Sequence, residues 1–239
     1  YKDGIIVGIF QAMALIPDPA FALRAAECWH PSHLGTLGYA WLSSGSLRTA
    51  LKRLERYSRI LGQKASCKCG DTAEGLCFSF DTGRGDAPVG HAVADFALSL
   101  IFSMCRTNVG SPLAPLTAGL RRPLPAKRQP YDDYFGCKVE FGAAEDHFVL
   151  ARDVADRPLP TANQELARTF DAILAAQLAA LREEEIEGRC KAWLLKELTS
   201  GEPSEEGLAR ALAMSRRTLQ RKLGECGLTY RGLLEKTRY

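Results

Sequence analysis

The sequence has 239 residues, of which 46% are hydrophobic and 25% charged, enough for one medium-sized domain and a small one. This composition excludes an intrinsically disordered chain, and no low-complexity tract interrupts it. The whole formal charge of +3 lies in residues 201–239, which hold eight cationic and five anionic side chains. Such asymmetry favours a nucleic-acid-binding module beside a neutral domain.

The first apolar segment, residues 4–16, has the character of a signal-peptide core. It is too short to span a bilayer, so a buried helix is the better prediction. The sequence does not begin with Met, and we expect its true N-terminus to lie upstream. The other long apolar segment, Val93–Met104, is interrupted by Asp95. We therefore expect a cytoplasmic protein that does not associate with a membrane.

The next elements are an amphipathic helix, a hairpin and a second helix. Ser46 opens the first helix, whose leucines recur at helical spacing, and Gly62 ends it. Residues 64–80 form two alternating runs separated by glycines, a pattern typical of a β-hairpin. Residues 90–105 are then predicted to form a mostly buried helix.

A similar order of elements is predicted to follow. It comprises a strand, a short helical turn and the two strands of a second hairpin, at residues 113–120, 131–136, 138–141 and 147–150. Thr161 or Asn163 is expected to cap a long helix, with a further helix at residues 188–198. Because helix, hairpin and helix occur twice, we predict an internal pseudo-repeat within one α+β domain.

The C-terminal segment has the layout of two short helices joined by a tight turn. Ser204 is a suitable N-cap for the first helix, and Glu205 and Glu206 suit the positive end of its dipole. Met214 and Ser215 form the turn, and Ser215 is expected to cap the second helix. That helix has one apolar face, which comprises Leu219, Leu223 and Cys226.

This layout is that of a DNA-reading helix-turn-helix, whose second helix enters the major groove. Arg can bond guanine with two hydrogen bonds, Gln can read adenine, and cationic side chains neutralise phosphates. The candidate DNA-binding residues are Ser215, Arg216, Arg217, Thr218, Gln220, Arg221 and Lys222. The alternative for this segment is a charged surface helix in an ordinary helical tail.

The residues Leu208-Ala-Arg-Ala-Leu-Ala-Met-Ser-Arg-Arg-Thr-Leu-Gln-Arg-Lys-Leu223, followed by Gly227-Leu-Thr-Tyr-Arg-Gly-Leu-Leu234, closely resemble the first helix-turn-helix of AraC/XylS-type transcription regulators. Four upstream segments resemble the arabinose-binding-like sensor domain of one branch of that family, at residues 18–24, 33–39, 135–141 and 157–160. The resemblance covers nearly the whole chain.

The resemblance implies an architecture and a set of partners. Residues 1–198 would form an α+β effector-binding and dimerisation domain, residues 199–203 a linker, and residues 204–239 an all-α, incomplete DNA-binding module. The positions matching Arg217, Gln220 and Arg221 reach base edges in that family. The implied partners are double-stranded DNA, a small-molecule effector of unknown identity, a second copy of the chain and RNA polymerase. Effector binding would change the domain arrangement or the dimer state, and so the affinity for DNA.

The sequence departs from the family pattern at one point. The family carries a second helix-turn-helix after a linker helix, whereas this sequence stops at Tyr239, within that expected linker. A chain that ends there is expected to bind DNA weakly or not at all.

In the sensor part, several side chains are candidates for binding an effector. The basic, proline-bearing stretch would suit an anionic molecule, and the aromatic residues would line an apolar pocket; the candidates are Tyr39, Trp41, Phe78, Phe80, Arg121, Arg122 and Arg128. A solvated loop explains the arginines, and core packing explains the aromatic residues equally well.

The cysteines raise a second hypothesis. Most of the eight are expected to be reduced, buried thiols, because the chain is too long for a disulfide scaffold. Cys67, Cys69 and Cys77 nevertheless suggest a thiol- or metal-responsive regulator, although zinc prefers four ligands. A third hypothesis is an interaction adaptor that never contacts DNA. No catalytic set has recognisable spacing, so we expect neither an enzyme, nor a cofactor, nor a resident metal.

Overall fold

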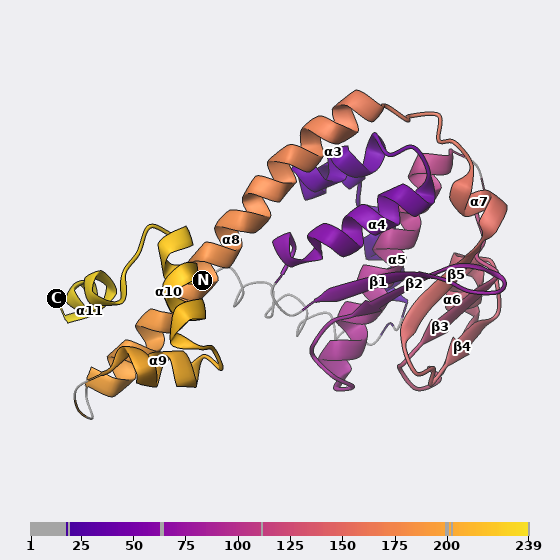
Figure 1. Cartoon of the computed structure of the whole chain (residues 1–239). Helices are drawn as coiled ribbons and strands as arrows, with labels where there is room; N and C mark the ends of the chain where they lie inside the picture. Colours follow the sequence, from indigo (N-terminus) through magenta and orange to yellow (C-terminus); the bar gives the residue numbers. More distant parts are fainter. Residues whose placement is uncertain are drawn as a thin grey trace. The chain divides into compact units, whose positions relative to one another are not determined.

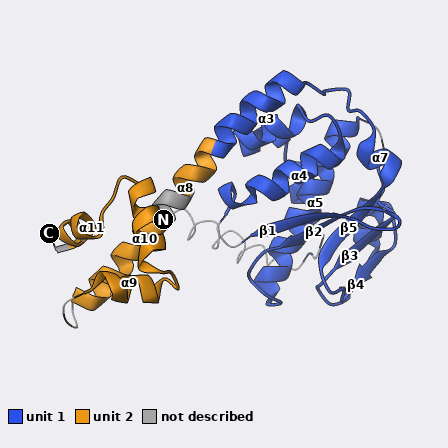
Figure 2. Ribbon diagram, viewed as in Figure 1, with its two compact units in different colours: residues 1–175 blue, residues 176–239 orange. Residues whose placement is uncertain are grey.

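The computed structural model describes residue 18 and residues 20–62, 65–110, 112–198, 201 and 203–238. The helix predicted at residues 4–16 lies outside the described residues, as do the side chains of residues 182–185. The chain divides into two compact units, residues 1–175 (unit 1) and residues 176–239 (unit 2), which are coloured separately in Figure 2. The division falls within one long helix, α8 (Gln164–Leu198).

Unit 1 mixes helices and strands, as predicted for an α+β domain (Figure 1). Its described helices before α8 are α2 (Phe21–Glu27), α3 (Thr36–Leu42), α4 (Leu47–Tyr57), α5 (Pro88–Val109), α6 (Gln129–Phe135) and α7 (Arg152–Asp156), with short 3-10 turns η1 (Pro31–Leu34) and η2 (Ser58–Ile60). Its described strands are β1 (Ser66–Asp71), β2 (Gly75–Asp81), β3 (Thr117–Leu120), β4 (Val139–Phe141) and β5 (Asp146–Ala151).

The strands form one sheet in the order β1-β2-β5-β3-β4. The first predicted hairpin is confirmed, because β1 and β2 pair antiparallel. The second predicted hairpin is wrong: β3 lies between β4 and β5, parallel to β4 and antiparallel to β5. The other edge of β5 pairs with β2, so both its edges are hydrogen-bonded to strands remote in sequence. The pseudo-repeat of helix, hairpin and helix therefore does not exist.

The predicted start of α4 is confirmed by a capping box. The hydroxyl of Ser46 accepts a hydrogen bond from the backbone N–H of Thr49 at 3.2 Å. In return, the hydroxyl oxygen of Thr49 accepts one from the backbone N–H of Ser46 at 2.9 Å. These two bonds satisfy donors that a helix start otherwise leaves free. Leucines on one face of α4 are buried, as the amphipathic pattern predicted.

Among the described residues, α5 is long and apolar enough to cross a membrane by length and composition alone. The apolar run at Val93–Met104 did not predict a spanning length, because Asp95 interrupts it. In the fold, most of the helix is buried within unit 1, and Phe102 packs on Phe148 of β5 with ring centroids 5.4 Å apart. Phe148 in turn stacks on Phe78 of β2. We therefore describe α5 as the central core helix of unit 1.

Helix α8 begins where the sequence suggested, and Asn163 rather than Thr161 caps it. The side chain of Asn163 accepts a hydrogen bond from the backbone N–H of Leu166 at 3.0 Å, whereas Thr161 donates to the carbonyl of Leu42. The separate helix predicted after residue 187 is wrong, because α8 runs without a break through Gly188. A glycine weakens a helix by only about 1 kcal/mol and need not end it.

Unit 2 is formed by the end of α8 with α9 (Glu205–Ala211), α10 (Arg216–Glu225) and α11 (Tyr230–Arg238). These helices share an apolar core of Cys190, Leu194, Leu208, Ala209, Leu212, Leu219, Leu223 and Leu233. Because Cys190 and Leu194 belong to this core, the structure divides the chain before the expected linker at residues 199–203. The functional division at residues 198 and 204 stays a prediction.

Candidate nucleic-acid interface

Helices α9 and α10 are held by two capped N-termini and a tight turn. The hydroxyl of Ser204 accepts from the backbone N–H of Gly207 at 3.1 Å, and Ser215 accepts from that of Thr218 at 3.1 Å. Both predicted caps are therefore present. In the turn, Ala213 adopts a left-handed conformation with φ of 53°, which is uncommon for a residue other than glycine. These features fix the start of α10 relative to α9.

The buried face of α10 is apolar and the opposite face is polar. Leu219 and Leu223 are fully buried in the core of unit 2. The structure places the candidate DNA-binding residues on the other side: Ser215, Arg216, Arg217, Gln220 and Arg221 are exposed, and Thr218 and Lys222 are partly exposed. The long polar side chains therefore lie away from the buried leucines.

The exposed residues of α10 differ in their partners. Arg216 and Gln220 both donate hydrogen bonds to the carboxylate of Glu205, at 2.6 and 3.0 Å. Arg221 pairs with Glu225 one turn further along the helix. Arg217 and the partly exposed Lys222 have no ion pair or hydrogen bond within the described part of the chain, so both charges are available to an anionic partner, and that of Arg217 is the more exposed.

Ser215 and Thr218 have structural roles as well. Their hydroxyl oxygens lie 2.8 Å apart, within hydrogen-bonding distance, and Ser215 also caps the helix. If these two hydroxyls contacted DNA, they would use the same oxygen atoms that already stabilise the first turn of α10. Within the candidate set, the charged and amide side chains are therefore better placed for direct readout than the hydroxyls.

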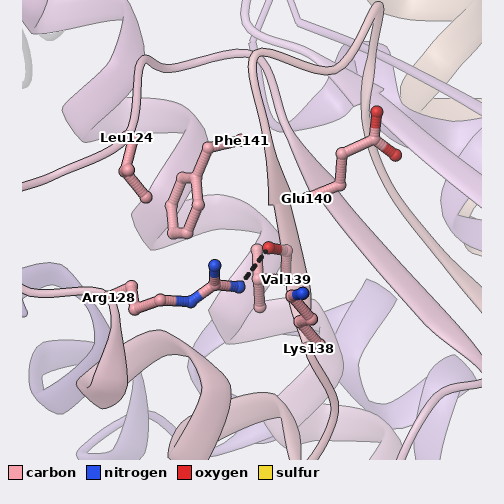
Figure 3. A pocket seen from close by; sticks show the side chains of 6 residues that line it. All are labelled: Leu124, Arg128, Lys138, Val139, Glu140 and Phe141. Carbon is pink, nitrogen blue, oxygen red and sulfur yellow. Dashed lines mark hydrogen bonds between the residues drawn. The ribbon is translucent and has the colours of Figure 1, made fainter.

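In unit 1, a shallow hollow of about 370 Å³ lies at the edge strand β4. It is lined by Leu124, Arg128, Lys138, Val139, Glu140 and Phe141 (Figure 3). In this view the side chains of Leu124 and Phe141 point toward one another, whereas Glu140 points away. Arg128 donates to the carbonyl of Val139 at 3.0 Å and pairs with Asp132 at 2.8 Å, so its charge is already compensated.

The candidate effector-binding residues are not gathered around this hollow. Of the set, only Arg128 lines it. Trp41 and Phe78 are almost fully buried in the core, and Phe80 is partly buried. Tyr39 is half-exposed and stacks on Phe170, with ring centroids 5.9 Å apart.

Two further arginines of that set are paired with carboxylates. Arg121 forms an ion pair with Asp86 at 2.6 Å, and Arg122 pairs with the buried Asp95. The structure thus places the aromatic candidates largely in core or stacking positions and the basic candidates in ion pairs. Any effector-binding role for these residues remains a prediction.

Comparison with known proteins decides the family. The family described as the N-terminal arabinose-binding domain of AraC transcription regulators matches residues 9–159, more than half of the chain. This chain belongs to the AraC family of transcription regulators. The ornithine utilization regulator of Pseudomonas aeruginosa is 30% identical, over 96% of this chain and 68% of that protein.

This chain is also similar to a more distant relative and to a solved structure. The HTH-type transcriptional regulator VirS of Mycobacterium tuberculosis is 24% identical, over 98% of this chain and 69% of its own length. The crystal structure of the transcriptional regulator CdpR from Pseudomonas aeruginosa has a TM-score of 0.62 at 21% identity. It covers 97% of this chain and 76% of CdpR, and it supports the fold alone.

The cysteines of this AraC-family chain are not brought together as the thiol hypothesis required. In the register of the hairpin, Cys67 and Cys69 lie opposite Phe80 and Phe78, whereas Cys77 lies opposite Gly70. Paired residues of an antiparallel ladder share a face and neighbours alternate, so Cys77 points to the other side of the sheet. Burial raises the pKa of Cys67 to about 12 and that of Cys69 to about 11.

The described residues also show no arrangement of side chains suited to a metal ion. Among the described residues, no cluster of three or more His, Cys, Asp or Glu side chains is arranged to hold a metal ion. Thiols whose pKa is raised by burial carry little thiolate, the form that reacts and binds metals. The geometry therefore gives the thiol- or metal-responsive hypothesis no support.

Two features of this AraC-family regulator were not predicted from the sequence. The contact of Glu205 with α10 was missed, because Glu205 was interpreted only as a partner of the helix dipole. The buried pair of Asp95 and Arg122 was missed, because the two residues are remote in sequence. An acidic residue within an apolar helix is a signal that could have pointed to a buried partner for Asp95.

Proposed function

We propose that this AraC-family chain is a DNA-binding transcription regulator in which α9 and α10 form a helix-turn-helix and α10 reads the major groove. The observation that carries the proposal is the exposed polar face of α10, opposite its buried leucines. Arg217 projects from that face with no partner among the described residues. The concentration of the formal positive charge in residues 201–239 supports the same conclusion, because phosphate contacts provide much of the affinity for DNA.

The roles follow from the chemistry of each side chain. The guanidinium groups of Arg217 and Arg221 are suited to guanine edges or phosphates, and the amide of Gln220 is suited to adenine. Arg221 must exchange its ion pair with Glu225 for a DNA contact. That exchange costs little, because both side chains are more than half exposed and a surface pair contributes on the order of 1 kcal/mol or less.

The test compares two single-charge variants of the chain. Arg217→Ala is expected to weaken binding to a duplex selected from a random pool by about 5- to 150-fold, which corresponds to about 1–3 kcal/mol. Arg231→Ala removes the same charge from α11, where the side chain is 89% exposed, and is the matched control. Fluorescence anisotropy at low salt measures both affinities, because the electrostatic contribution is largest there. Equal affinity losses in the two variants would contradict reading by α10.

Control by a small-molecule effector is a second part of the proposal. The matched family is described as an arabinose-binding domain, and one relative is named for ornithine utilization. These names support L-arabinose and L-ornithine as first probes. Native mass spectrometry would detect a molecule carried through purification, and thermal unfolding with each probe would detect binding, since a ligand of the folded state raises stability.

The regulatory step is then testable with any ligand found in this way. Effector control predicts that the affinity for a selected duplex changes when the ligand is added, because domain arrangement or self-association changes. Analytical ultracentrifugation with and without ligand would measure the second of these. Equal DNA affinity in both states would remove effector control but leave DNA binding intact.

A further inference from the structure

The carboxylate of Glu205 joins two residues of α10 from outside that helix. Its Oε2 accepts a hydrogen bond from Nε of Arg216 at 2.6 Å, and its Oε1 accepts one from Nε2 of Gln220 at 3.0 Å. Arg216 and Gln220 are four residues apart in a helix, so their side chains lie on the same side of it. The carboxylate of Glu205 therefore bonds both side chains, with one oxygen accepting from each.

The burial of Glu205 distinguishes it from its neighbour. The side chain of Glu205 is 16% exposed, whereas that of Glu206 is 70% exposed and lies 3.9 Å from Arg216. A charge-assisted hydrogen bond is stronger when its acceptor is shielded from water. The contact of Glu205 with α10 is therefore a short, shielded hydrogen-bonded pair, whereas that of Glu206 is a long ion pair at the surface.

The contact has two consequences for DNA recognition. First, the charge of Arg216 is compensated, so Arg216 adds a phosphate contact only by leaving Glu205. Second, one N–H of the Gln220 amide is occupied by Glu205, which restrains the amide, while its carbonyl oxygen and second N–H have no hydrogen-bond partner among the described residues. Those are the two groups with which a glutamine reads adenine.

We propose that Glu205 is a specificity-determining positioning residue, which orients Gln220 for base readout and withholds Arg216 from non-specific phosphate contact. The inference rests on the proposed function, because it requires α10 to face DNA. Both effects act in the same direction: they raise the ratio of specific to non-specific affinity rather than the affinity itself.

Two substitutions separate the two effects. Glu205→Gln removes the charge but retains an amide oxygen that can still accept from Gln220. It should tighten binding to a random duplex on the order of ten-fold at 0.1 M salt, with a log–log salt slope steeper by about one, because Arg216 is released to a phosphate. Glu205→Ala should do the same and also flatten the base preference at one position of a selected site.

Matched controls make the test decisive. Glu206→Gln removes the same charge one residue away and should change the salt slope by much less than Glu205→Gln. In the background of Gln220→Ala, Glu205→Ala should cause no further loss of base preference, because its effect acts through that amide. Circular dichroism confirms that each variant keeps its helices.

The results distinguish failure of the inference from failure of the proposed function. If Arg217→Ala weakens binding while Glu205→Gln behaves like Glu206→Gln, or Glu205→Ala keeps the wild-type base preference, the role of Glu205 is overturned and reading by α10 stands. If the wild-type chain binds the selected duplex and Arg217→Ala binds it equally well, α10 does not face DNA and both conclusions fail.

Discussion

The hydroxyl of Tyr131 in α6 donates a hydrogen bond of 3.0 Å to the carboxylate of Asp95 in α5, inside unit 1. Arg122 donates to the same carboxylate oxygen, Oδ2. Asp95 is 2% exposed, and its other oxygen has no hydrogen-bond partner among the residues that the structure describes. Burial raises the pKa of Asp95 to about 6, although Arg122 and Tyr131 favour the charged form. A buried carboxylate with one unpaired oxygen therefore holds its proton more tightly than an exposed one.

This relationship predicts a pH dependence of stability. Because the pKa of Asp95 is raised in the folded state, the stability that its protonated form contributes is present below pH 3.8 and is lost as pH rises through about 6. Between pH 4.5 and 7, the wild-type chain should lose about 2 kcal/mol relative to Asp95→Asn. Urea unfolding at the two pH values measures the difference.

The control for that prediction has the opposite sign. The pKa of Asp156 is lowered by its hydrogen bond to Arg48, so its contribution to stability is present above pH 3.8 and lost as pH falls. Asp156→Asn should therefore cost more stability at neutral pH than at acidic pH. A cost of Asp95→Asn that does not change with pH would rule out the raised pKa of Asp95.

The cysteines should differ sharply in reactivity. Cys28 is exposed, whereas Cys67, Cys105 and Cys190 are buried, with pKa values raised by burial. At pH 8, an aromatic disulfide reagent should modify Cys28 first in the folded chain, and the buried thiols only after unfolding. Cys28→Ser should remove the fast phase of the absorbance change. Fast labelling of Cys67 would revive the thiol-responsive hypothesis.

Two glycines predict opposite effects of the same substitution. A Cβ at Gly38 in α3 would lie 1.7 Å from the carbonyl oxygen of Pro31, so the two backbone segments would have to separate. Gly38→Ala should therefore destabilise unit 1 by about 3 kcal/mol or more. At Gly188 in α8 no atom of the described residues lies within 4 Å of the added Cβ, and Gly188→Ala should stabilise the helix by up to about 1 kcal/mol.

Thermal unfolding compares these variants directly. The melting temperature should fall for Gly38→Ala and stay equal or rise for Gly188→Ala. A stable Gly38→Ala chain would mean that α3 and η1 do not approach as closely as the structure has them. A destabilised Gly188→Ala chain would mean that α8 is interrupted at Gly188, as the separate helix predicted at residues 188–198 implied.

Local patterns predicted the elements whose partners are close in sequence. Ser46, Ser204 and Ser215 cap helices because an N-cap needs only a hydroxyl and the backbone two or three residues ahead. The hairpin of β1 and β2 follows from alternation and turn residues alone. Asn163 starts α8 for the same reason as the serine caps, although the sequence left Thr161 as an equal candidate.

Pairing between distant segments was not predictable in the same way. The alternation at residues 138–141 and 147–150 favours strands, but it does not say which strand each will pair with. β3 enters between them because its backbone groups pair parallel with β4 and antiparallel with β5. An alternation of period two looks the same whichever strand is the pairing partner. The sequence therefore favoured pairing with the strand nearest in the chain.

Sequence alone determined which faces of the helices are apolar, where the serine caps of α4, α9 and α10 lie and that the positive charge gathers near the C-terminus, because each depends on residue type and short spacing. Tertiary structure decided the order of the strands in the sheet, the burial of Asp95 beside Arg122 and the hydrogen bonds of Arg216 and Gln220 to Glu205. Those contacts join residues far apart in the chain, and such contacts produce no repeating pattern in the sequence. Their energies also depend on distances and burial that exist only in the folded chain.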